Sequence, residues 1–210
     1  LIDTGLTHMR AAVLDLMASE LQTPEAVLLT HYHEDHSGNA AAVKKRFNIP
    51  VYGSAETARK LARPYRIFPY QHLMWGPTEP LDVSLLPEIY EINGLRFEPV
   101  YTPGHSKDHT VFLVPDRGWL FSGDIYLSHH IKYFRADERI DDQIRSLKKL
   151  RTLDFDALFC GHHPQPEKGK DYIIRKLQYL EDFYGSVAAL IEKGLSPSEI
   201  MKSLGLKEVT

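Results

Sequence analysis

The chain has a single cysteine, Cys160, among its 210 residues, so no disulfide can form within it. So few thiols fit a reducing compartment, and we expect a cytoplasmic location. The sequence has no apolar run long enough to cross a bilayer and no signal-peptide pattern at Leu1. We therefore expect no membrane partner. Leu1 stands inside a strand-like run without an initiator methionine, and we expect natural N-terminal strands to precede it.

An excess of charge of either sign is also absent. The 25 Lys and Arg residues nearly balance the 28 Asp and Glu residues, which gives a formal net charge of −3. A basic run, Lys44-Lys45-Arg46, lies on the polar side of a predicted helix and is typical of a solvated face. The charge balance therefore gives no support for an extended nucleic-acid surface. The length suits one well-buried core.

Apolar runs typical of buried strands alternate with segments of helical periodicity. The predicted strands are 26–29, 50–53, 89–92, 95–101, 110–114, 119–122 and 155–160. The predicted helices are 9–21, 39–47, 55–62, 137–150, 170–193 and 196–204. Asn93-Gly94 predicts a two-residue hairpin turn. The strands thus fall in two clusters with helices between them. This order predicts a mixed fold of the α/β (α+β) class.

Residues 63–87 interrupt this order. The segment contains five prolines, several aromatic residues and no clear period. We interpret it as a long loop that forms a lid over an active site, with Tyr70 and Trp75 as substrate contacts. Two alternatives stay open: the loop folds back and buries its aromatic side chains, or it forms a homodimer contact.

The strongest chemical signal is the stretch from Thr30 to Asn39, which begins where the predicted strand 26–29 ends. It holds three histidines and two carboxylates within six residues, in the pattern H-x-H-x-D-H. Imidazole and carboxylate are preferred ligands of zinc and similar divalent metals. Three further pairs follow apolar runs, namely Gly104-His105, Gly123-Asp124 and Gly161-His162. A glycine before each polar residue permits a sharp turn at a crowded strand end.

With these four motifs the sequence resembles the metallo-β-lactamase superfamily from Leu1 to about Pro166. It looks most like the branches of glyoxalase II (hydroxyacylglutathione hydrolase) and β-lactamase-like protein 2. The resemblance implies a four-layer αββα sandwich. Residues 1–166 would form the catalytic domain, and residues 167–210 a helical C-terminal extension packed on it.

The resemblance also implies two divalent metal ions, with zinc as the first choice and iron or manganese as alternatives. One ion would be bound by His31, His33 and His105, and the other by Asp35, His36 and His162. Asp124 would bridge both. Asp35 and Asp124 would also take part in catalysis by offsetting cation charge. Protonation of the leaving group would fall either to Asp35 or to a water molecule. His163 directly follows His162 and is an alternative ligand or a supporting residue.

Supporting and substrate-binding roles are expected for a few more residues. Asp3 would orient the ligand loop, or else cap the following helix. His109 would support the site without binding metal. Substrate contacts are expected from a loop after Asp124, at His129, His130, Lys132 and Tyr133.

The predicted reaction is hydrolysis of a small thioester, ester or lactone by a hydroxide held between two metal ions. The partner is then a small-molecule substrate. The alternative is a single-strand endoribonuclease or phosphodiesterase that uses the same site, and only this alternative implies a nucleic-acid partner. Hydrolysis of β-lactams is disfavoured because a secretion signal is missing.

Overall fold

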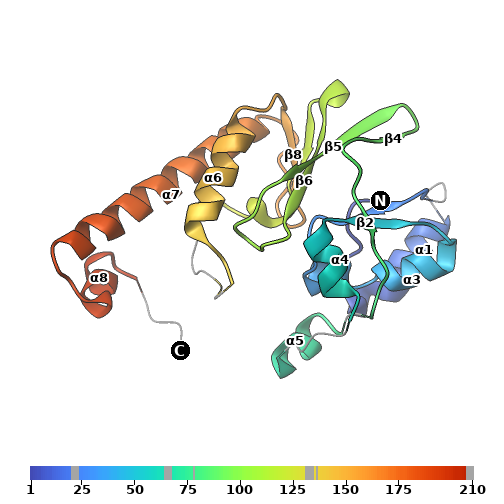
Figure 1. Ribbon diagram of the computed structural model, residues 1–210, viewed down its shortest axis with the longest axis horizontal. Coiled ribbons are helices and arrows are strands. Elements are labelled where there is room, and N and C mark those ends of the chain that lie inside the picture. The colour runs from blue at the N-terminus through green and yellow to red at the C-terminus, as the bar shows by residue number, and fades with distance from the viewer. Residues whose placement is uncertain (20–23, 64–67, 78, 131–134, 136, 207–210) are drawn as a thin grey trace.

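The computed structural model describes residues 1–19, 24–63, 68–77, 79–130, 135 and 137–206. Two β-sheets lie in the middle of the molecule, and helices cover the outer side of each sheet (Figure 1). This is the αββα sandwich that the resemblance implied. The fold class is therefore confirmed.

The first sheet contains three short parallel strands in the order β1-β2-β3. Their bounds are β1 (Val27–Leu28), β2 (Val51–Gly53) and β3 (Ser84–Leu85). The helices on its outer side are α1 (Arg10–Ser19), α3 (Ala40–Phe47) and α4 (Ala55–Leu61), preceded by a 3-10 turn, η1 (Thr7–Met9). A buried apolar cluster that includes Met17, Val27, Val43, Val51 and Leu61 joins these elements.

The second sheet has the order β4-β5-β6-β7-β8, antiparallel except for the parallel pair β7-β8. Its strands are β4 (Tyr90–Ile92), β5 (Leu95–Tyr101), β6 (Thr110–Val114), β7 (Trp119–Phe121) and β8 (Ala157–Phe159). Between β6 and β7 lies η2 (Pro115–Arg117). The turn between β4 and β5 has positive φ angles at Asn93 and Gly94, as the predicted hairpin requires.

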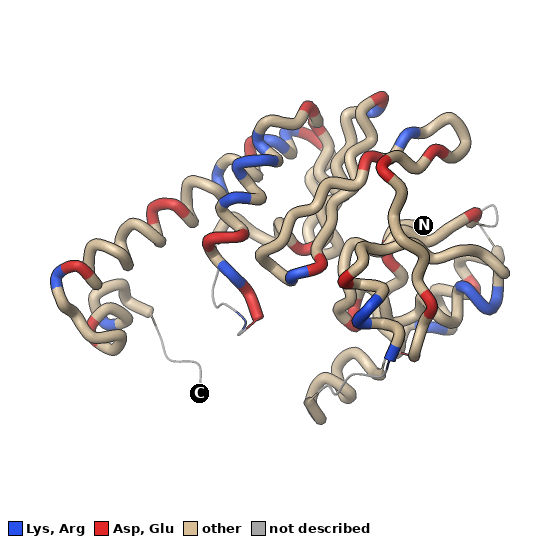
Figure 2. The backbone as a smooth tube through the Cα atoms, viewed as in Figure 1, with Lys and Arg blue, Asp and Glu red and all other residues tan. Residues whose placement is uncertain are grey.

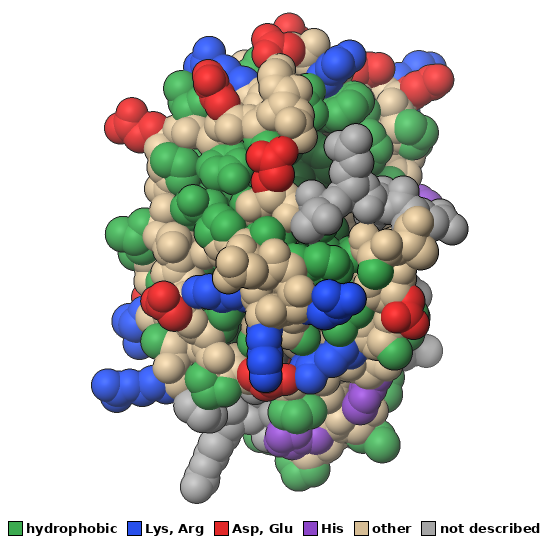
Figure 3. All heavy atoms as spheres, turned by 90° about the vertical axis from the view of Figure 1, so that its right-hand side faces the viewer, with side chains coloured by type: hydrophobic (Ala, Val, Ile, Leu, Met, Phe, Trp, Pro, Cys, Tyr) green, Lys and Arg blue, Asp and Glu red, His purple; other side chains and the backbone are tan. Residues whose placement is uncertain are grey.

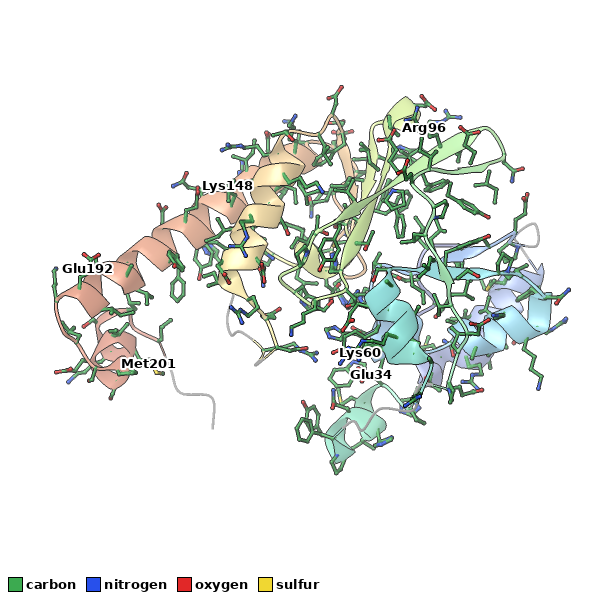
Figure 4. The ribbon with its side chains drawn as sticks, viewed as in Figure 1. Glu34, Lys60, Arg96, Lys148, Glu192 and Met201 are labelled. Atoms are coloured by element: carbon green, nitrogen blue, oxygen red, sulfur yellow. The ribbon has the colours of Figure 1, made fainter. Side chains whose placement is uncertain are left out.

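Helices α6 (Ile140–Arg151) and α7 (Gly169–Glu192) cover the second sheet. Leu147, Leu150, Ile173 and Leu177 bury their side chains against strand residues such as Leu158. On the solvent side, Lys148 of α6 pairs with Glu181 of α7 at 2.8 Å (Figure 4). A short helix, α8 (Pro197–Ser203), follows α7 and begins with a capping box at Ser196 and Glu199.

The prediction of a structureless loop over residues 63–87 is wrong. Helix α5 (Pro69–Met74) forms in this segment, and β3 pairs with β2. Pro69 suits the first helical turn, and Oε1 of Gln71 accepts a hydrogen bond from the Phe68 amide at 2.7 Å. Such a short helix leaves too little sequence for a period to show. The side chain of Tyr70 is 59% exposed, so α5 does not fold back to bury it. The lid and homodimer interpretations stay predictions.

Charged side chains are spread over the surface of the molecule. Figure 2 shows acidic and basic residues interspersed along α6 and α7. On the face beyond the first sheet, Lys and Arg side chains lie among acidic and apolar ones (Figure 3). Among the ion pairs of the described residues, Arg10 pairs with Glu79 at 2.7 Å and Lys44 with Asp82 at 3.7 Å. Within the described residues, no helix combines the length and the apolar character needed to span a membrane.

Candidate metal centre

The H-x-H-x-D-H stretch lies where the first sheet meets the second. Strand β1 ends at Leu28, and the chain then turns through Thr30 into the short helix α2 (Glu34–Ser37). This turn brings His31, His33 and His36 inward together, and each is at most 2% exposed. A continuing strand would have placed successive side chains on opposite faces.

Three imidazoles form a first group. Nδ1 of His33 lies 3.0 Å from Nε2 of His31 and 3.0 Å from Nε2 of His105. All three side chains are buried, and their nitrogens converge on one point. Three converging imidazole nitrogens match the donor set that binds zinc and other divalent transition metals in proteins.

A second group lies beside the first and mixes carboxylates with imidazoles. It consists of Asp35, His36, Asp124 and His162, whose ligand atoms all lie within 4.8 Å of one another. Nε2 of His36 is 3.1 Å from Oδ1 of Asp124, and Nε2 of His162 is 3.5 Å from Oδ2 of Asp35. Asp124 belongs to the turn η3 (Gly123–Ile125), directly after β7.

Asp124 lies between the two groups. Its Oδ1 faces His36 and His162, whereas its Oδ2 is 3.6 Å from Nε2 of His105. Oδ1 of Asp124 and Nε2 of His36 are buried and lie 3.1 Å apart, but neither makes a well-aligned hydrogen bond in the described part of the chain. Burying such atoms without a partner is costly, and a bound cation would remove that cost. The donor set therefore fits two metal ions with a carboxylate between them.

Asp3 and Thr30 hold two of these histidines from behind. Asp3 accepts hydrogen bonds from the Thr30 amide at 2.8 Å and from the Thr30 hydroxyl at 2.7 Å. Its Oδ2 also lies 2.7 Å from Nδ1 of His36, and Oγ1 of Thr30 lies 2.9 Å from Nδ1 of His31. Each contact occupies one ring nitrogen and leaves Nε2 facing the cluster. Asp3 thus contacts the ligand loop itself, as one of its two predicted roles requires.

Carboxylates from the segment before α6 support two more rings. Oε1 of Glu138 lies 2.8 Å from Nδ1 of His105, and Oδ2 of Asp137 lies 3.5 Å from Nε2 of His33. Sequence reasoning missed both acidic residues because they belong to no motif. Their position at the start of a predicted amphipathic helix suggested only a favourable first turn.

His109 contacts Asp124 through the backbone. Its Nε2 accepts a hydrogen bond from the Asp124 amide at 3.1 Å, and its Nδ1 donates to Oγ1 of Thr102 at 2.9 Å. His109 is fully buried. The ring therefore contacts the backbone of the turn that carries Asp124, and its supporting role stays a prediction.

Charge is distributed unequally over the two groups. Burial and the neighbouring histidines lower the pKa of His31 well below its ordinary value, so this ring is neutral at pH 7. Burial opposes a charge on His36, yet the Asp3 and Asp124 carboxylates raise its pKa well above the usual range. The neighbouring carboxylates of Asp124 and Asp35 raise the pKa of His162 to about 10. Without metal, the second group therefore holds protons that a metal ion would displace.

Two cavities reach the cluster. One, of about 540 Å³, lies between Leu1–Asp3 and aromatic residues of the second sheet, including Trp119 and Phe121. The other, of about 360 Å³, is lined by Asp35, His105, Asp124 and His162 together with residues of α6, α7 and the loop after Asp124. Both cavities are lined by Asp35 and His162, so a ligand in either one reaches the second group.

The other predicted site residues have different outcomes. The structure brings His162 into the second group, whereas His163 is exposed and its backbone amide donates to Sγ of Cys160. His130 lines the 360 Å³ cavity. Among the described lining residues of both cavities, His129, Tyr70 and Trp75 do not occur. Lys132 and Tyr133 lie outside the described residues.

Comparison with known proteins places this geometry in a family. The model of the metallo-beta-lactamase superfamily matches residues 1–162. A hydroxyacylglutathione hydrolase of Serratia proteamaculans (strain 568) is 31% identical over 83% of this chain, and a beta-lactamase-like protein 2 homolog of Drosophila melanogaster is 29% identical over 77%. The chain spans only 62% and 53% of the lengths of these two relatives.

Solved structures agree with this assignment. A metallo-beta-lactamase family protein of Thermus thermophilus, TTHA1429, superposes with a TM-score of 0.72 at 22% identity, over 90% of this chain and 73% of its own. TTHA1623, solved in a di-iron-bound form, gives a TM-score of 0.63 at 28% identity, over 81% and 84%. The chain belongs to the metallo-beta-lactamase superfamily.

Proposed function

We propose that the protein is a metal-dependent hydrolase that cleaves a small thioester, ester or lactone, in the manner of a hydroxyacylglutathione hydrolase. The observation that carries this proposal is the pair of converging donor groups with Asp124 between them. Hydroxyacylglutathione hydrolases among the similar proteins support the thioester class.

The proposed cofactor is a pair of divalent ions, held by the three-histidine group and by the group of Asp35, His36 and His162, with Asp124 shared. When bound, such a pair supplies a hydroxide at neutral pH and polarises the scissile carbonyl group. Zinc is our first choice because imidazole and carboxylate suit it. Iron is the main alternative, since a similar protein was solved with two irons.

The residues of the chain would hold and orient the reacting groups. Asp3 and Glu138 would fix the ring nitrogens of His36 and His105, and Asp137 faces Nε2 of His33 at 3.5 Å, so these ligands would be oriented before substrate arrives. Asp35 lines both cavities, and we propose that its carboxylate would take up the proton that the attacking water releases and pass it to the leaving group, with a water molecule as the alternative proton donor. His130 would contact substrate in the smaller cavity.

Domain organisation and location complete the proposal. Residues 1–166 would form the catalytic domain, and residues 167–210 an extension that packs on it through α7. We propose a cytoplasmic location because a chain with a single cysteine suits a reducing compartment.

Single-strand ribonuclease activity is the second candidate, supported by the similarity to a beta-lactamase-like protein 2 homolog. The charge around the cluster argues against it, because Asp35, Asp137 and Glu138 are acidic and a nucleic-acid track needs basic and aromatic side chains. We therefore rank it below thioester hydrolysis.

Hydrolysis of S-lactoylglutathione by zinc-loaded protein tests the proposal, with and without a strong chelator. We expect turnover that the chelator abolishes and that Asp124→Ala lacks. Turnover that survives chelation would contradict the metal-dependent mechanism. If no turnover occurs while metal stays bound, the glutathione thioester is the wrong substrate, and other thioesters, lactones and single-stranded RNA should be assayed next.

A further inference from the structure

Lys176 is a buried cation beside the candidate metal centre with no role in the proposed reaction. It lies on α7, and its side chain enters the wall of the 360 Å³ cavity that Asp124, His105 and His162 also line. Only 3% of the residue is exposed. Its Nζ donates a hydrogen bond of 2.7 Å to the carbonyl oxygen of Ile125, in the turn that carries Asp124. This bond fixes the position of the ammonium group at the cavity.

The ammonium group of Lys176 has no carboxylate partner of its own among the described residues. The nearby carboxylates are engaged elsewhere: Glu138 with His105, and Asp124 with His36 and His162. Burial lowers the pKa of Lys176 to about 8, which still leaves the group mostly charged at pH 7. A buried, unpaired cation is costly, and it usually persists where a ligand or a reaction uses it.

Gln143 of α6 lines the same cavity. It is 2% exposed, and its Oε1 is buried without a hydrogen-bond partner in the described part of the chain. The amide group can turn either its oxygen or its NH₂ toward a ligand. Within the described residues, Lys176 thus has two ammonium N–H groups without an acceptor, and Gln143 has an amide whose oxygen lacks a partner. This combination of donors suits a carboxylate.

We propose that Lys176 and Gln143 form a carboxylate-binding subsite for the acyl part of the substrate, next to the scissile bond. The inference rests on the proposed hydrolase function and adds to it a preference for acyl groups that carry their own carboxylate over acyl groups, such as lactoyl, that do not. The acyl part is favoured over the leaving group because both residues are almost fully buried, so only a small group reaches them. The larger leaving group would then extend toward solvent.

Two matched thioesters of N-acetylcysteamine test the subsite. One carries a glutaryl group, and the other the corresponding 4-carbamoylbutanoyl group, which replaces the carboxylate by a neutral amide of similar shape. Wild-type, zinc-loaded protein should hydrolyse the glutaryl ester with a kcat/KM at least about tenfold higher, because a hydrogen bond to a charged group is worth that much. Lys176→Met should remove this preference, so that the ratio of the two kcat/KM values falls to about one, whatever the rate with the neutral thioester.

Arg175→Met is the matched control. Arg175 is the exposed neighbour of Lys176 on α7, so the variant loses the same charge outside the cavity. It should keep the wild-type preference. Gln143→Leu should weaken the preference less than Lys176→Met does. If Lys176→Met does not fold, Lys176→Arg and Gln143→Leu carry the test, since Lys176→Arg keeps the charge and should keep a preference for the glutaryl ester.

Binding of free glutarate separates this inference from the proposed function. Calorimetric titration of the zinc-loaded protein should show that glutarate, which has two carboxylates, binds more tightly than glutaramate, whose single carboxylate cannot occupy the metal centre and the subsite at once. This difference should vanish in Lys176→Met when the two proteins are compared at equal zinc content. If no thioester is hydrolysed but this pattern holds, the hydrolase proposal fails and the anion subsite stands. If both thioesters are hydrolysed equally by wild type and by Lys176→Met, the subsite is wrong and the hydrolase proposal stands.

Discussion

Glu138 accepts a hydrogen bond from His105, with 2.8 Å between Oε1 and Nδ1, across 33 positions of the sequence. The carboxylate fixes the ring so that Nδ1 carries the proton and Nε2 faces His33 and Asp124. The segment before α6 thereby supports the three-histidine group, whose members follow β1 and β5. The candidate metal centre depends on contacts between all of these segments.

Glu138→Gln should weaken metal binding at the three-histidine group by about 10- to 100-fold, because the amide no longer stabilises the proton on Nδ1 of His105. A competition titration of zinc against a chromophoric chelator measures this loss. Glu167→Gln removes an exposed carboxylate outside the cluster and should bind zinc as wild type does. Equal zinc affinity in Glu138→Gln and wild type would show that the hydrogen bond does not tune the ligand.

Asp3→Asn should loosen the other group. The φ angle of Asp3 is +54°, a region that Asn tolerates, so the backbone is kept while one acceptor becomes a donor facing Nδ1 of His36. We expect the ion at Asp35, His36 and His162 to be lost first, by about tenfold or more in affinity. Zinc titration that resolves two steps, combined with NMR of the histidine side chains, measures which step moves. If Asp3→Asn lowered zinc affinity only at the three-histidine group, the assignment of Asp3 to the group of Asp35, His36 and His162 would be contradicted.

Zinc affinity of the second group should rise with pH. His162 has a pKa of about 10 without metal and His36 is raised as well, so protons compete with metal below those values. Each proton displaced makes the apparent affinity rise about tenfold per pH unit. His31 should add no displaced proton at pH 7, because burial and the neighbouring histidines already keep its ring neutral. Calorimetry in buffers of different ionisation enthalpy counts the released protons. No proton release at pH 7 would contradict these pKa shifts.

Gly123→Ala should destabilise the protein and weaken the centre. Gly123 has a φ angle of +45°, and a Cβ there would lie 2.7 Å from Nε2 of His109 and 2.9 Å from Thr30. A loss of about 2 kcal/mol or more in the free energy of unfolding is expected from the strain and the clash. Gly185→Ala is the control, since no atom within 4 Å opposes a Cβ in the middle of α7, and it should stabilise by about 0.5–1 kcal/mol. Chemical denaturation measures both changes.

The sequence predicted the candidate ligands because they occur in short motifs at strand ends. His31, His33, Asp35 and His36 lie within six positions, and the glycines before the other residues mark turns. The strands 95–101 and 110–114 have the predicted bounds, since their apolar runs end at clear turn residues. Periodicity therefore sufficed where a segment was long and its ends were marked.

Residues that act through long-range contacts were not predictable in this way. Glu138 and Asp137 look like ordinary acidic residues before a helix, and Lys176 interrupts an apolar face that otherwise predicts plain packing. Their positions follow from how α6 and α7 pack on the second sheet, which no local pattern encodes. Helix α5 was missed because six residues are too few for helical periodicity.

Counting the bound metal tests the central claim most directly. Zinc-loaded, desalted wild-type protein should contain two zinc ions per chain by elemental analysis, and S-lactoylglutathione or thioester hydrolysis should fall with the metal content as a chelator is added. His33→Ala and Asp124→Ala should lose metal and hydrolysis together. Full retention of two ions and of activity in either variant would contradict the assignment of the two donor groups.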